Sequence, residues 1–473
     1  MTADTDVVIA GLGPTGAVLA GLLAQWGVRS VVVERDREVY RQPRAAHFDG
    51  EIMRVFQQLG IADDLLPHTR ILPFYEFRNA AGQVLMHTAQ DDEDGPQGWR
   101  RSYMFHQPAM EELLRAKLAG DPRVRLRLGE SLTGIARNDA GGVRVSLAGE
   151  ELSARFLVGC DGGGSTVRKL SAIDLFDFGF DEPWLVIDTL VADESGLPEG
   201  GVQLCDPARP TTVMPMAPGR RRWEFMLRPG EQPQDMLDDA VIARLLAPWL
   251  APGAAKIVRK AVYRFHGVVA TRWRDGSVLL AGDAAHQMPP FMGQGMCSGV
   301  RDAAALAWRL GMILRHGAEP ALLDSYQAER DPQVRAIVAM AIAMGRVVCT
   351  QDEALAAARD RDFAARGASE PAGPPGLPPL MAGFLHPSPK AGELFPQPTL
   401  DGVRFDAIAG HRFSLVARDT AGLAAPAPIR VVAARGALTA WLDENDCDAV
   451  LIRPDRYIFG TGTAQELLRA AKL

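Results

Sequence analysis

The feature that most limits how this chain can fold is a glycine-rich turn between an apolar strand and an apolar helix. The strand covers residues 7–10, the turn spans residues 11–16 (GLGPTG), and a second apolar strand runs from Ser30 to Glu34. Glycines in such a turn let backbone N–H groups approach a pyrophosphate at the positive end of the helix. The pattern predicts a βαβ unit that binds a dinucleotide through Gly11, Gly13, Pro14, Thr15 and Gly16.

An acidic residue closes this unit. Glu34 ends the second strand, where a carboxylate accepts hydrogen bonds from the adenosine ribose of a bound dinucleotide. Arg35 follows it and is expected at the same edge of the cofactor. A tight turn that holds no ligand is the simpler interpretation of the glycines, but it leaves Glu34 unexplained. FAD and NAD share this fingerprint, so the choice between them depends on residues further along the chain.

A second glycine turn decides between the two cofactors. Residues 276–296 read GSVLLAGDAAHQMPPFMGQGM, in which an apolar strand over Ser277 to Ala281 precedes Gly282 and Asp283. A helix is expected from Met296 to His316. Its N-terminus carries roughly half a positive charge, which stabilises the extra electron density of a reduced flavin. The two prolines lack N–H donors and suit a wall beside the flavin ring.

This segment resembles the class A flavoprotein aromatic hydroxylases, the family of para-hydroxybenzoate hydroxylase and phenol hydroxylase. The runs 184–188, 221–227 and 394–398 resemble its 3-(3-hydroxyphenyl)propionate hydroxylase subgroup, and the likeness covers nearly the whole chain. The resemblance implies FAD as cofactor, NADH or NADPH as a transient co-substrate, and O2. It also implies that oxygen adds at flavin C4a and that the resulting hydroperoxide hydroxylates a small phenolic compound.

The resemblance implies which residues hold the flavin. Asp283 bonds a ribityl hydroxyl, and Asp161, in the run from Phe156 to Arg168, bears on both FAD and the reductant. The other implied positions lie near the flavin ring: Arg44, Gln107, Pro290, Gly293, Gly295 and Met296.

Residues for the proton and for the substrate carry weaker signals. His47 and Asp49 follow the second strand and are candidates to help deprotonate a phenol, although a lone histidine is more often structural. Arg220 and Arg222 are candidates to pair with a substrate carboxylate. A solvated basic turn is the alternative there, because arginines are mostly exposed. No metal site is expected.

The expected fold class is α/β, with a Rossmann-like FAD-binding domain, an inserted antiparallel-sheet substrate domain and a C-terminal thioredoxin-like domain. The FAD-binding domain covers 1–72, 104–172 and 268–350, and the substrate domain covers 73–103 and 173–267. Residues 351–385 are interpreted as a linker, because 356–379 is rich in Ala, Arg, Pro and Gly, and the tail is 386–473. The tail has no Cys-x-x-Cys, so dithiol exchange is not expected.

Several elements are predicted within these domains. Helices are expected at 49–59 and 108–118, each followed by glycine. Strands of the inserted sheet are expected at 185–191, 201–204, 211–215 and 223–227, and strands of the tail at 413–417, 429–433, 449–452 and 457–460.

Composition argues against nucleic acid and a membrane as partners, and the resemblance implies a small aromatic substrate. The net charge of −7 repels nucleic acid. The longest apolar run, Ala336 to Gly345, is far shorter than the roughly 20 residues of a membrane-spanning helix. Five widely spaced cysteines and an N-terminus without a signal pattern indicate a cytoplasmic protein. Monomer and homodimer both stay open.

Other functions are weighed against this one. A flavin monooxygenase that acts on a heteroaromatic or polyketide-type product, and a non-catalytic FAD- or ligand-binding protein, both stay open. A flavin halogenase would carry a Trp-x-Trp-x-Ile motif, which does not occur among the eight tryptophans. An NAD-dependent dehydrogenase would not need the segment from Gly282 to Met296.

Overall fold

The βαβ unit at the start of the chain forms the centre of an eight-stranded sheet, named sheet A. In the computed structural model, which describes residues 3–41, 44–89, 93–137, 141–366 and 376–471, its order is β17-β18-β11-β1-β2-β8, and β10 and β9 extend from β11. Neighbouring strands from β18 to β8 are parallel. Such strands are covered on both faces, and all six residues of β1 are accordingly buried, the last four of them apolar. The strands are β1 (Thr5–Ala10), β2 (Ser30–Glu34), β8 (Val124–Leu128), β9 (Gly134–Arg137), β10 (Val143–Leu147), β11 (Glu150–Gly159), β17 (Arg274–Asp275) and β18 (Val278–Leu280).

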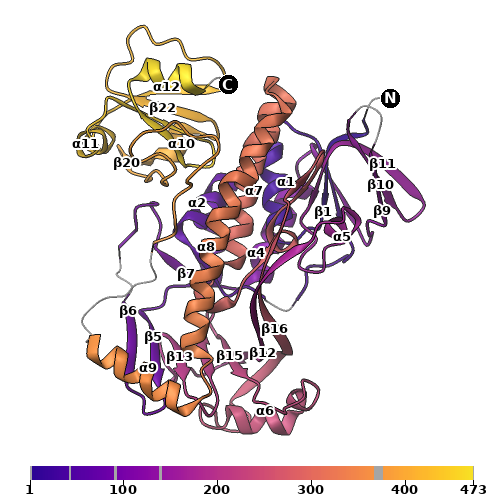
Figure 1. Cartoon of the computed structure of the whole chain (residues 1–473), viewed down its shortest axis with the longest axis vertical. Coiled ribbons are helices and arrows are strands. Elements are labelled where there is room, and N and C mark those ends of the chain that lie inside the picture. Colours follow the sequence, from indigo (N-terminus) through magenta and orange to yellow (C-terminus); the bar gives the residue numbers. More distant parts are fainter. Residues whose placement is uncertain (1–2, 42–43, 90–92, 138–140, 367–375, 472–473) are drawn as a thin grey trace.

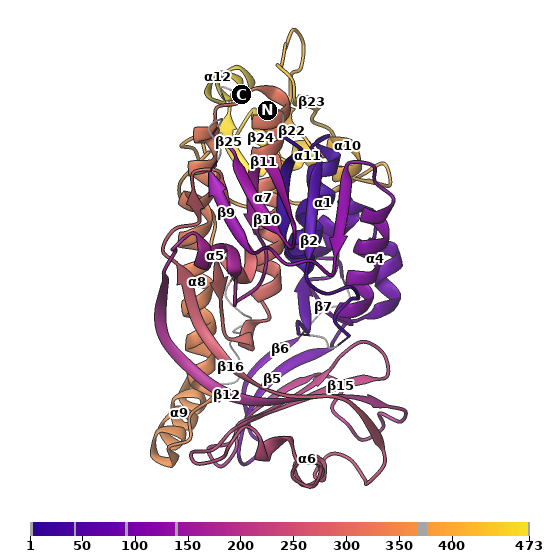
Figure 2. The ribbon, with the colours of Figure 1, turned by 90° about the vertical axis from the view of Figure 1, so that its right-hand side faces the viewer.

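Helices pack around sheet A, and the longest of them, α8, runs from the level of sheet A down to a second sheet (Figures 1 and 2). The helix α7 packs against α1 and α8. The helices of this part are α1 (Pro14–Gln25), α2 (Gly50–Leu59), α3 (Ala62–Leu65), α4 (Gln107–Ala119), α5 (Thr166–Leu170), α7 (Gly295–His316) and α8 (Asp324–Val348). Short 3-10 turns are η1 (Leu66–His68), η3 (Gly282–Ala284), η4 (Pro290–Met292) and η5 (Pro320–Leu323).

The second large sheet, named sheet B, lies below sheet A in Figure 2 and has the order β19-β16-β12-β15-β14-β13-β5-β6. Neighbouring strands in sheet B are antiparallel, except for the parallel pair β13 and β5. One of its faces packs on α6 over a core that includes Ile187, Trp223 and Phe225. Its elements are β5 (Phe74–Asn79), β6 (Val84–Ala89), β12 (Leu175–Val191), β13 (Gly201–Cys205), β14 (Thr211–Pro215), β15 (Arg220–Met226), β16 (Ala255–Ala270), β19 (His286–Gln287), η2 (Asp235–Leu237) and α6 (Asp239–Leu246).

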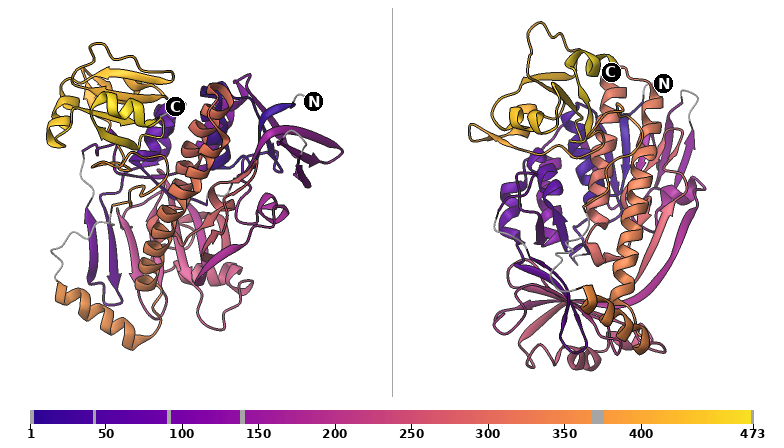
Figure 3. Two further views of the ribbon diagram at one scale, coloured as in Figure 1. Left: turned by 45° about the horizontal axis from the view of Figure 1, so that its top comes forward. Right: turned by 60° about the vertical axis from the view of Figure 1, so that its left-hand side comes forward.

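Residues 376–471, named the C-terminal unit, carry a four-stranded sheet of order β23-β22-β24-β25 in which only β22 and β23 are parallel. Figure 3 shows this unit beside the helices of sheet A. Its elements are β20 (Thr399–Leu400), β21 (Val403–Arg404), α10 (Phe405–Ala409), β22 (Phe413–Ala417), β23 (Ile429–Ala433), α11 (Ala437–Glu444), β24 (Ala449–Ile452), β25 (Ile458–Gly462) and α12 (Ala464–Ala471). A three-stranded sheet of β3 (His47–Asp49), β7 (Ser102–Phe105) and β4 (Thr69–Arg70) lies elsewhere in the molecule.

A buried ion pair and a buried hydrogen bond join the C-terminal unit to the rest of the chain. Arg54 of α2 donates to both carboxylate oxygens of Asp406, at 2.6 and 2.7 Å, and both side chains are almost fully buried. Trp308 of α7 donates to Asp455 at 2.8 Å. A bidentate pair such as Arg54–Asp406 fixes orientation as well as distance, so it helps to hold the unit in the position observed.

Part of the expected linker is helical. Residues Glu353–Arg366 form α9, because this part of the stretch is rich in the helix formers Ala and Arg and holds no proline. Pro378 and Pro379 lie in irregular chain, whereas the other three prolines of the stretch, at 371, 374 and 375, lie outside the described residues. Within the described residues no single helix is long and apolar enough to span a membrane. By length and composition alone, Pro320–Val348 and Glu353–Arg366 pass only as a pair bent by 110°.

Candidate functional site

A cavity of about 1650 Å³ lies at the carboxyl ends of the strands of sheet A, where open α/β sheets bind their ligands. Sheet B and the C-terminal unit supply its other walls, the latter through Leu394 and Tyr457 among others. Pockets for one small ligand measure roughly 300–1,000 Å³. The cavity therefore has room for a dinucleotide and a small aromatic molecule together.

The glycine turn forms one end of this cavity. Gly11 has φ +99°, and a Cβ on it would lie 2.4 Å from the Cys160 carbonyl oxygen, so no other residue fits there. A Cβ on Gly13 would meet nothing within 4 Å, because this position faces the cavity, as do Pro14 and Thr15. Gly16 does not line the cavity and packs against the Gly11 carbonyl instead. The first N–H groups of α1 have no partner within the helix and remain available to a pyrophosphate.

Glu34 lies beside this turn with its carboxylate partly used. One oxygen accepts from the Leu12 N–H at 2.7 Å and the other from the Asp36 N–H at 3.0 Å. A carboxylate has about four acceptor sites, so two remain for ribose hydroxyls. Arg35 lines the rim of the cavity, with 73% of its side chain exposed.

Asp283 points into the cavity from η3, directly after β18. Its carboxyl is reached by solvent from the cavity but enclosed by protein on the other sides. This enclosure raises its pKa, and the charges of His286 and Arg44 oppose the rise. No hydrogen bond to this carboxylate forms within the described parts of the chain, so both its oxygens are open to a ligand.

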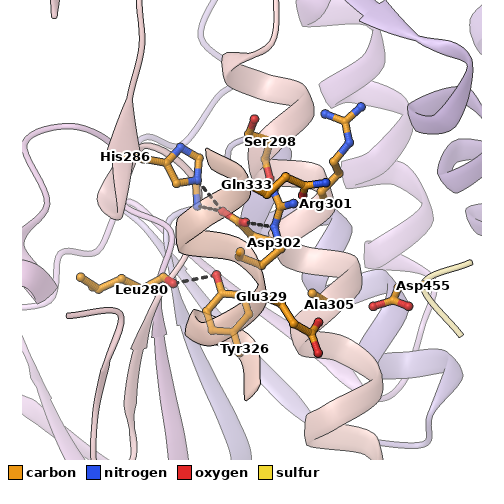
Figure 4. A network of polar contacts seen from close by, with 12 residues as sticks. Leu280, His286, Ser298, Arg301, Asp302, Ala305, Tyr326, Glu329, Gln333 and Asp455 are labelled. Carbon is orange, nitrogen blue, oxygen red and sulfur yellow. Dashed lines mark hydrogen bonds and ion pairs between the residues drawn. The ribbon is translucent and has the colours of Figure 1, made fainter. Parts of the chain in front are cut away.

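A fully buried network holds the Asp283 turn from behind (Figure 4). Asp302 of α7 accepts from the Gly282 N–H at 2.9 Å, from His286 Nε2 at 2.7 Å and from Arg330 Nε at 2.9 Å. Burial alone would raise the pKa of Asp302, but His286 and Arg330 outweigh it and lower the pKa below its ordinary value. Tyr326 donates to the Leu280 carbonyl at 3.0 Å. The turn is therefore fixed at both of its ends.

Asp161 lines the cavity, yet its carboxylate serves the protein. It accepts from the Ser165 hydroxyl at 2.5 Å and from the Thr166 and Val167 N–H groups at 2.6 and 3.0 Å. These bonds satisfy the free N–H groups at the start of α5. The geometry gives Asp161 a structural task in addition to any contact with a ligand.

The turn before α7 faces the same cavity, through Pro290, Gly293, Gly295 and Met296. Gly293 has φ +63°, and a Cβ on it would lie 2.6 Å from His47 Nδ1. His47 donates from this nitrogen to the Gly293 carbonyl at 3.3 Å. Burial lowers the pKa of His47, so the ring is neutral and its Nε2 carries a lone pair. Asp49 accepts from Ile52 N–H, Arg301 and Gln294, so both of its carboxylate oxygens are engaged.

Arg44 and Gln107 meet at the opposite wall. Gln107 Oε1 accepts from the Arg44 and Ala45 N–H groups at 2.8 and 2.6 Å, and its amide donates to Glu111 at 2.7 Å. Arg44 lies over the ring of Tyr40. Gln107 therefore fixes the backbone that carries Arg44, and both side chains line the cavity.

Arg220 and Arg222 do not form a solvated turn. They lie in β15, where the antiparallel pairing with β12 buries Arg222. Arg222 lines the cavity and makes a bidentate pair with Asp188, at 2.7 and 3.2 Å, and donates to the Arg44 carbonyl at 3.0 Å. Arg220 is not among the residues that line the cavity. The three consecutive arginines were interpreted as a solvated turn because charged residues are mostly exposed.

Sequence reasoning missed a row of buried polar side chains on the cavity face of sheet B. Gln203 donates to the Tyr75 hydroxyl oxygen at 2.7 Å and accepts from the Thr212 hydroxyl at 2.7 Å. Thr212 is also hydrogen bonded to Glu224. Burial raises the pKa of Tyr75, although Gln203 opposes the rise, so this residue stays a hydroxyl donor. Polar residues alternating with apolar ones in the strands were the available signal.

Within the described residues, no group of three or more His, Cys, Asp or Glu side chains is arranged to hold a metal ion. The cavity instead fits FAD. Its glycine turn leaves backbone donors for a pyrophosphate, Glu34 and Asp283 offer open acceptors for hydroxyl groups, and a helix N-terminus faces the far end.

Comparison with known proteins agrees with this assignment. The chain belongs to the FAD binding domain family, which matches residues 4–341, and residues 418–472 match the HcaD C-terminal domain. It is 38% identical to a probable NADH-specific resorcinol 4-hydroxylase of Rhodococcus jostii (strain RHA1), over 98% of this chain and 95% of that protein. It is 35% identical to a 3-(3-hydroxy-phenyl)propionate/3-hydroxycinnamic acid hydroxylase of Mycobacterium sp. (strain JLS), over 98% and 90%.

Solved structures share the fold. Aklavinone-11 hydroxylase in complex with FAD and aklavinone superposes with a TM-score of 0.82 at 24% identity, over 100% of this chain and 99% of that one. The flavin-dependent monooxygenase PieE superposes with a TM-score of 0.83 at 21% identity, over 99% of each chain. The protein is thus a flavin-dependent aromatic hydroxylase of mixed α/β fold. The expected cofactors, FAD with a reduced nicotinamide and O2, are confirmed.

Proposed function

We propose that this protein uses NADH to hydroxylate a neutral phenol that carries no carboxylate, such as a dihydroxybenzene. The observation that carries this proposal is the charge balance on the cavity face of sheet B. Arg222 is held by Asp188, by the Arg44 carbonyl and, at 3.8 Å, by Glu224. Arg259 donates to the same Asp188 at 3.1 Å, so two arginines face two acidic side chains. A substrate carboxylate would have to break a buried ion pair, which is strongly unfavourable. The name of the Rhodococcus relative, an NADH-specific resorcinol hydroxylase, supports the same substrate class and reductant.

Each part of FAD is proposed to bind a different part of the cavity wall. The pyrophosphate lies at the glycine turn of Gly11 to Gly16, the adenosine ribose on Glu34 near Arg35, and the ribityl chain on Asp283. The ring lies against the turn before α7. The supporting residues around it are Arg44, Gln107, Asp161, Pro290, Gly293, Gly295 and Met296. Bound FAD supplies the reduction and oxygen chemistry, and the protein binds, orients and excludes water.

Tyr75 is proposed to bind the hydroxyl of the substrate. Because Gln203 donates to its oxygen, the Tyr75 proton is directed elsewhere, and it is not donated to any of the described residues. The side chain lines the cavity. A hydroxyl donor at this point stabilises a phenol oxygen as it becomes negative, and it adds no charge that would select a carboxylate.

His47 is proposed to accept the proton of the phenol. Its Nδ1–H is used on the Gly293 carbonyl, which leaves Nε2 as the acceptor nitrogen. Asp49 is proposed to act through its charge, which raises the pKa of His47 against the lowering effect of burial. The carboxylate of Asp49 itself is committed to Arg301, Gln294 and the start of α2.

The pH profile tests the role of His47. Burial lowers its pKa below the ordinary 6.5, so the ring can accept a proton at all pH values above that lowered pKa and loses this capacity as the pH falls through it. We expect kcat/KM for phenol hydroxylation to decline on the acid side only below pH 6.5. In His47→Asn, which can still donate to Gly293, the decline should vanish. An unchanged acid limb in this variant would remove His47 from the proton step.

Substrate-stimulated NADH consumption tests the function. Resorcinol and related neutral phenols should stimulate NADH oxidation by the FAD-loaded protein and yield hydroxylated products, with a higher kcat/KM than 3-(3-hydroxyphenyl)propionate. The Tyr75→Phe variant should lower kcat/KM for the same phenols about tenfold, mainly through kcat, because a hydrogen bond to a charge that develops in the transition state contributes about 1.5 kcal/mol. A preference for the propionate would favour carboxylated phenols. Stimulation only by hydroxyquinolones would favour a heteroaromatic substrate, and no stimulation at all would favour a binding protein.

The domain organisation follows as part of the proposal. Residues 1–72, 104–172 and 268–350 form the FAD-binding domain, and 73–103 with 173–267 form an inserted substrate domain, which is supported by β5 and β6 joining sheet B. The order of the sheet in 386–473, with one parallel and two antiparallel pairs, supports a thioredoxin-like domain. The five free cysteines support a reducing cytoplasm as the compartment.

A further inference from the structure

The Gln294 side chain holds the turn before α7 from behind. Gln294 stands between Gly293 and Gly295 and is 6% exposed. Its Oε1 accepts from Arg301 Nη1 at 2.9 Å, and its Nε2 donates to Asp49 at 3.2 Å. Flanking glycines give this turn little stiffness of their own. Its shape therefore depends on the two side chains that bind Gln294.

Arg301 is the centre of this support. It lies seven residues after Gln294, two turns further along the same face of α7. Its Nη2 donates to Asp49 at 2.5 Å and its Nε to Glu51 at 2.6 Å, and only 2% of its side chain is exposed. Burial alone would lower the pKa of Arg301, but Asp49 and Glu51 raise it well above the ordinary value. The guanidinium therefore stays charged, and each of its three nitrogens donates a hydrogen bond.

The C-terminal unit completes this cluster. Tyr457, directly before β25, donates its hydroxyl to Glu51 Oε1 at 3.2 Å, while Arg301 binds the other oxygen. Tyr457 is 7% exposed and lines the cavity. Burial and the charge of Glu51 raise its pKa, so it remains a donor. A continuous path of hydrogen bonds runs from Tyr457 through Glu51 and Arg301 to Gln294.

We propose that Tyr457 is a positioning residue of the active site, through which the C-terminal unit fixes the turn that holds the flavin ring. This inference rests on the proposed position of FAD. Each hydrogen bond along the path from Tyr457 to Gln294 orients the next side chain. Tyr457 fixes one oxygen of Glu51, which presents the other to Arg301, whose fork then has a single orientation toward Gln294. The N–H groups of the turn and of the first residues of α7 are thereby aimed into the cavity.

Tyr457→Phe tests this inference, with Tyr103→Phe as the matched control. Tyr103 is a buried tyrosine outside the cavity whose oxygen accepts from the Arg100 N–H at 2.9 Å, so its variant also loses one hydrogen bond. The dissociation constant of FAD, measured by fluorescence titration of the apoprotein, should rise about threefold to tenfold in Tyr457→Phe and stay unchanged in Tyr103→Phe. The visible spectrum of bound FAD should shift only in the Tyr457 variant.

Glu51→Gln separates positioning from general stability. It keeps the size of the side chain but weakens its hold on Arg301, so it should raise the FAD dissociation constant as well. Adding Tyr457→Phe to Glu51→Gln should then cause little further loss. Full additivity of the two effects, or unchanged FAD binding and spectrum in Tyr457→Phe, would overturn the inference. If Tyr457→Phe fails to fold, unchanged FAD binding by Glu51→Gln would overturn it alone. A wild-type protein that does not bind FAD would instead refute the proposed function.

Discussion

Replacement of Asp283 by alanine is expected to raise the dissociation constant of FAD about 10-fold to 100-fold, because hydrogen bonds to a charged group contribute about 1.5–3 kcal/mol and each 1.4 kcal/mol is a factor of ten. The carboxylate opens into the cavity and has no hydrogen bond within the described residues, so a ligand hydroxyl is its natural partner. Fluorescence titration of the apoprotein with FAD measures the change.

Asp161→Ala is the comparison for this variant. Asp161 lines the same cavity, but its oxygens bind Ser165 and the start of α5. Its loss should weaken FAD binding less and lower thermal stability more. Equal FAD retention in the two variants would show that the ribityl contact is assigned to the wrong carboxylate.

Asp302→Ala is expected to destabilise the fold by about 3–5 kcal/mol, which is the usual cost of leaving a buried partner uncompensated. Asp302 is fully buried and binds His286, Arg330 and the Gly282 N–H. Urea unfolding of the apoprotein measures the loss. Asp324→Ala, which removes an exposed partner of Arg274, should cost about 1 kcal/mol or less.

The loss of stability in Asp302→Ala is expected to depend on pH. The pKa of Asp302 is lower in the folded protein than its ordinary value of 3.8. Its stabilising effect is therefore complete above about pH 3.8 and is lost as the pH falls through the lower folded value. The difference in stability between wild type and Asp302→Ala should be constant near neutral pH and narrow in strong acid. A difference that grows in acid would contradict the assigned charge state.

Local signals explain which parts of the site could be predicted. The glycine turn and Glu34 belong to one βαβ unit, in which backbone geometry and ligand contacts are set by residues close in sequence. The helix after Gly295 begins within one residue of its expected start, since glycines and prolines punctuate that segment. The strands of sheet B were recognised in part, but β12 begins at Leu175, ten residues before the expected strand.

Non-local contacts explain what could not be predicted. Tyr75, Gln203 and Glu224 become neighbours only through the pairing of β5, β13, β14 and β15, and no spacing in the sequence encodes that pairing. Tyr457 reaches Glu51 across more than 400 residues. The basic run in β15 was interpreted as exposed because its charge is visible in the sequence. The buried acid that neutralises Arg222, Asp188, lies on the neighbouring strand β12 and is not near it in the sequence.

The cavity wall includes Tyr457, which comes from the C-terminal unit, and Gly11, which comes from the first βαβ unit. A ligand that fills the cavity therefore contacts parts of the chain that lie more than 400 residues apart in the sequence. Its binding opposes any separation of the C-terminal unit from the rest of the fold, because a ligand stabilises the state that binds it.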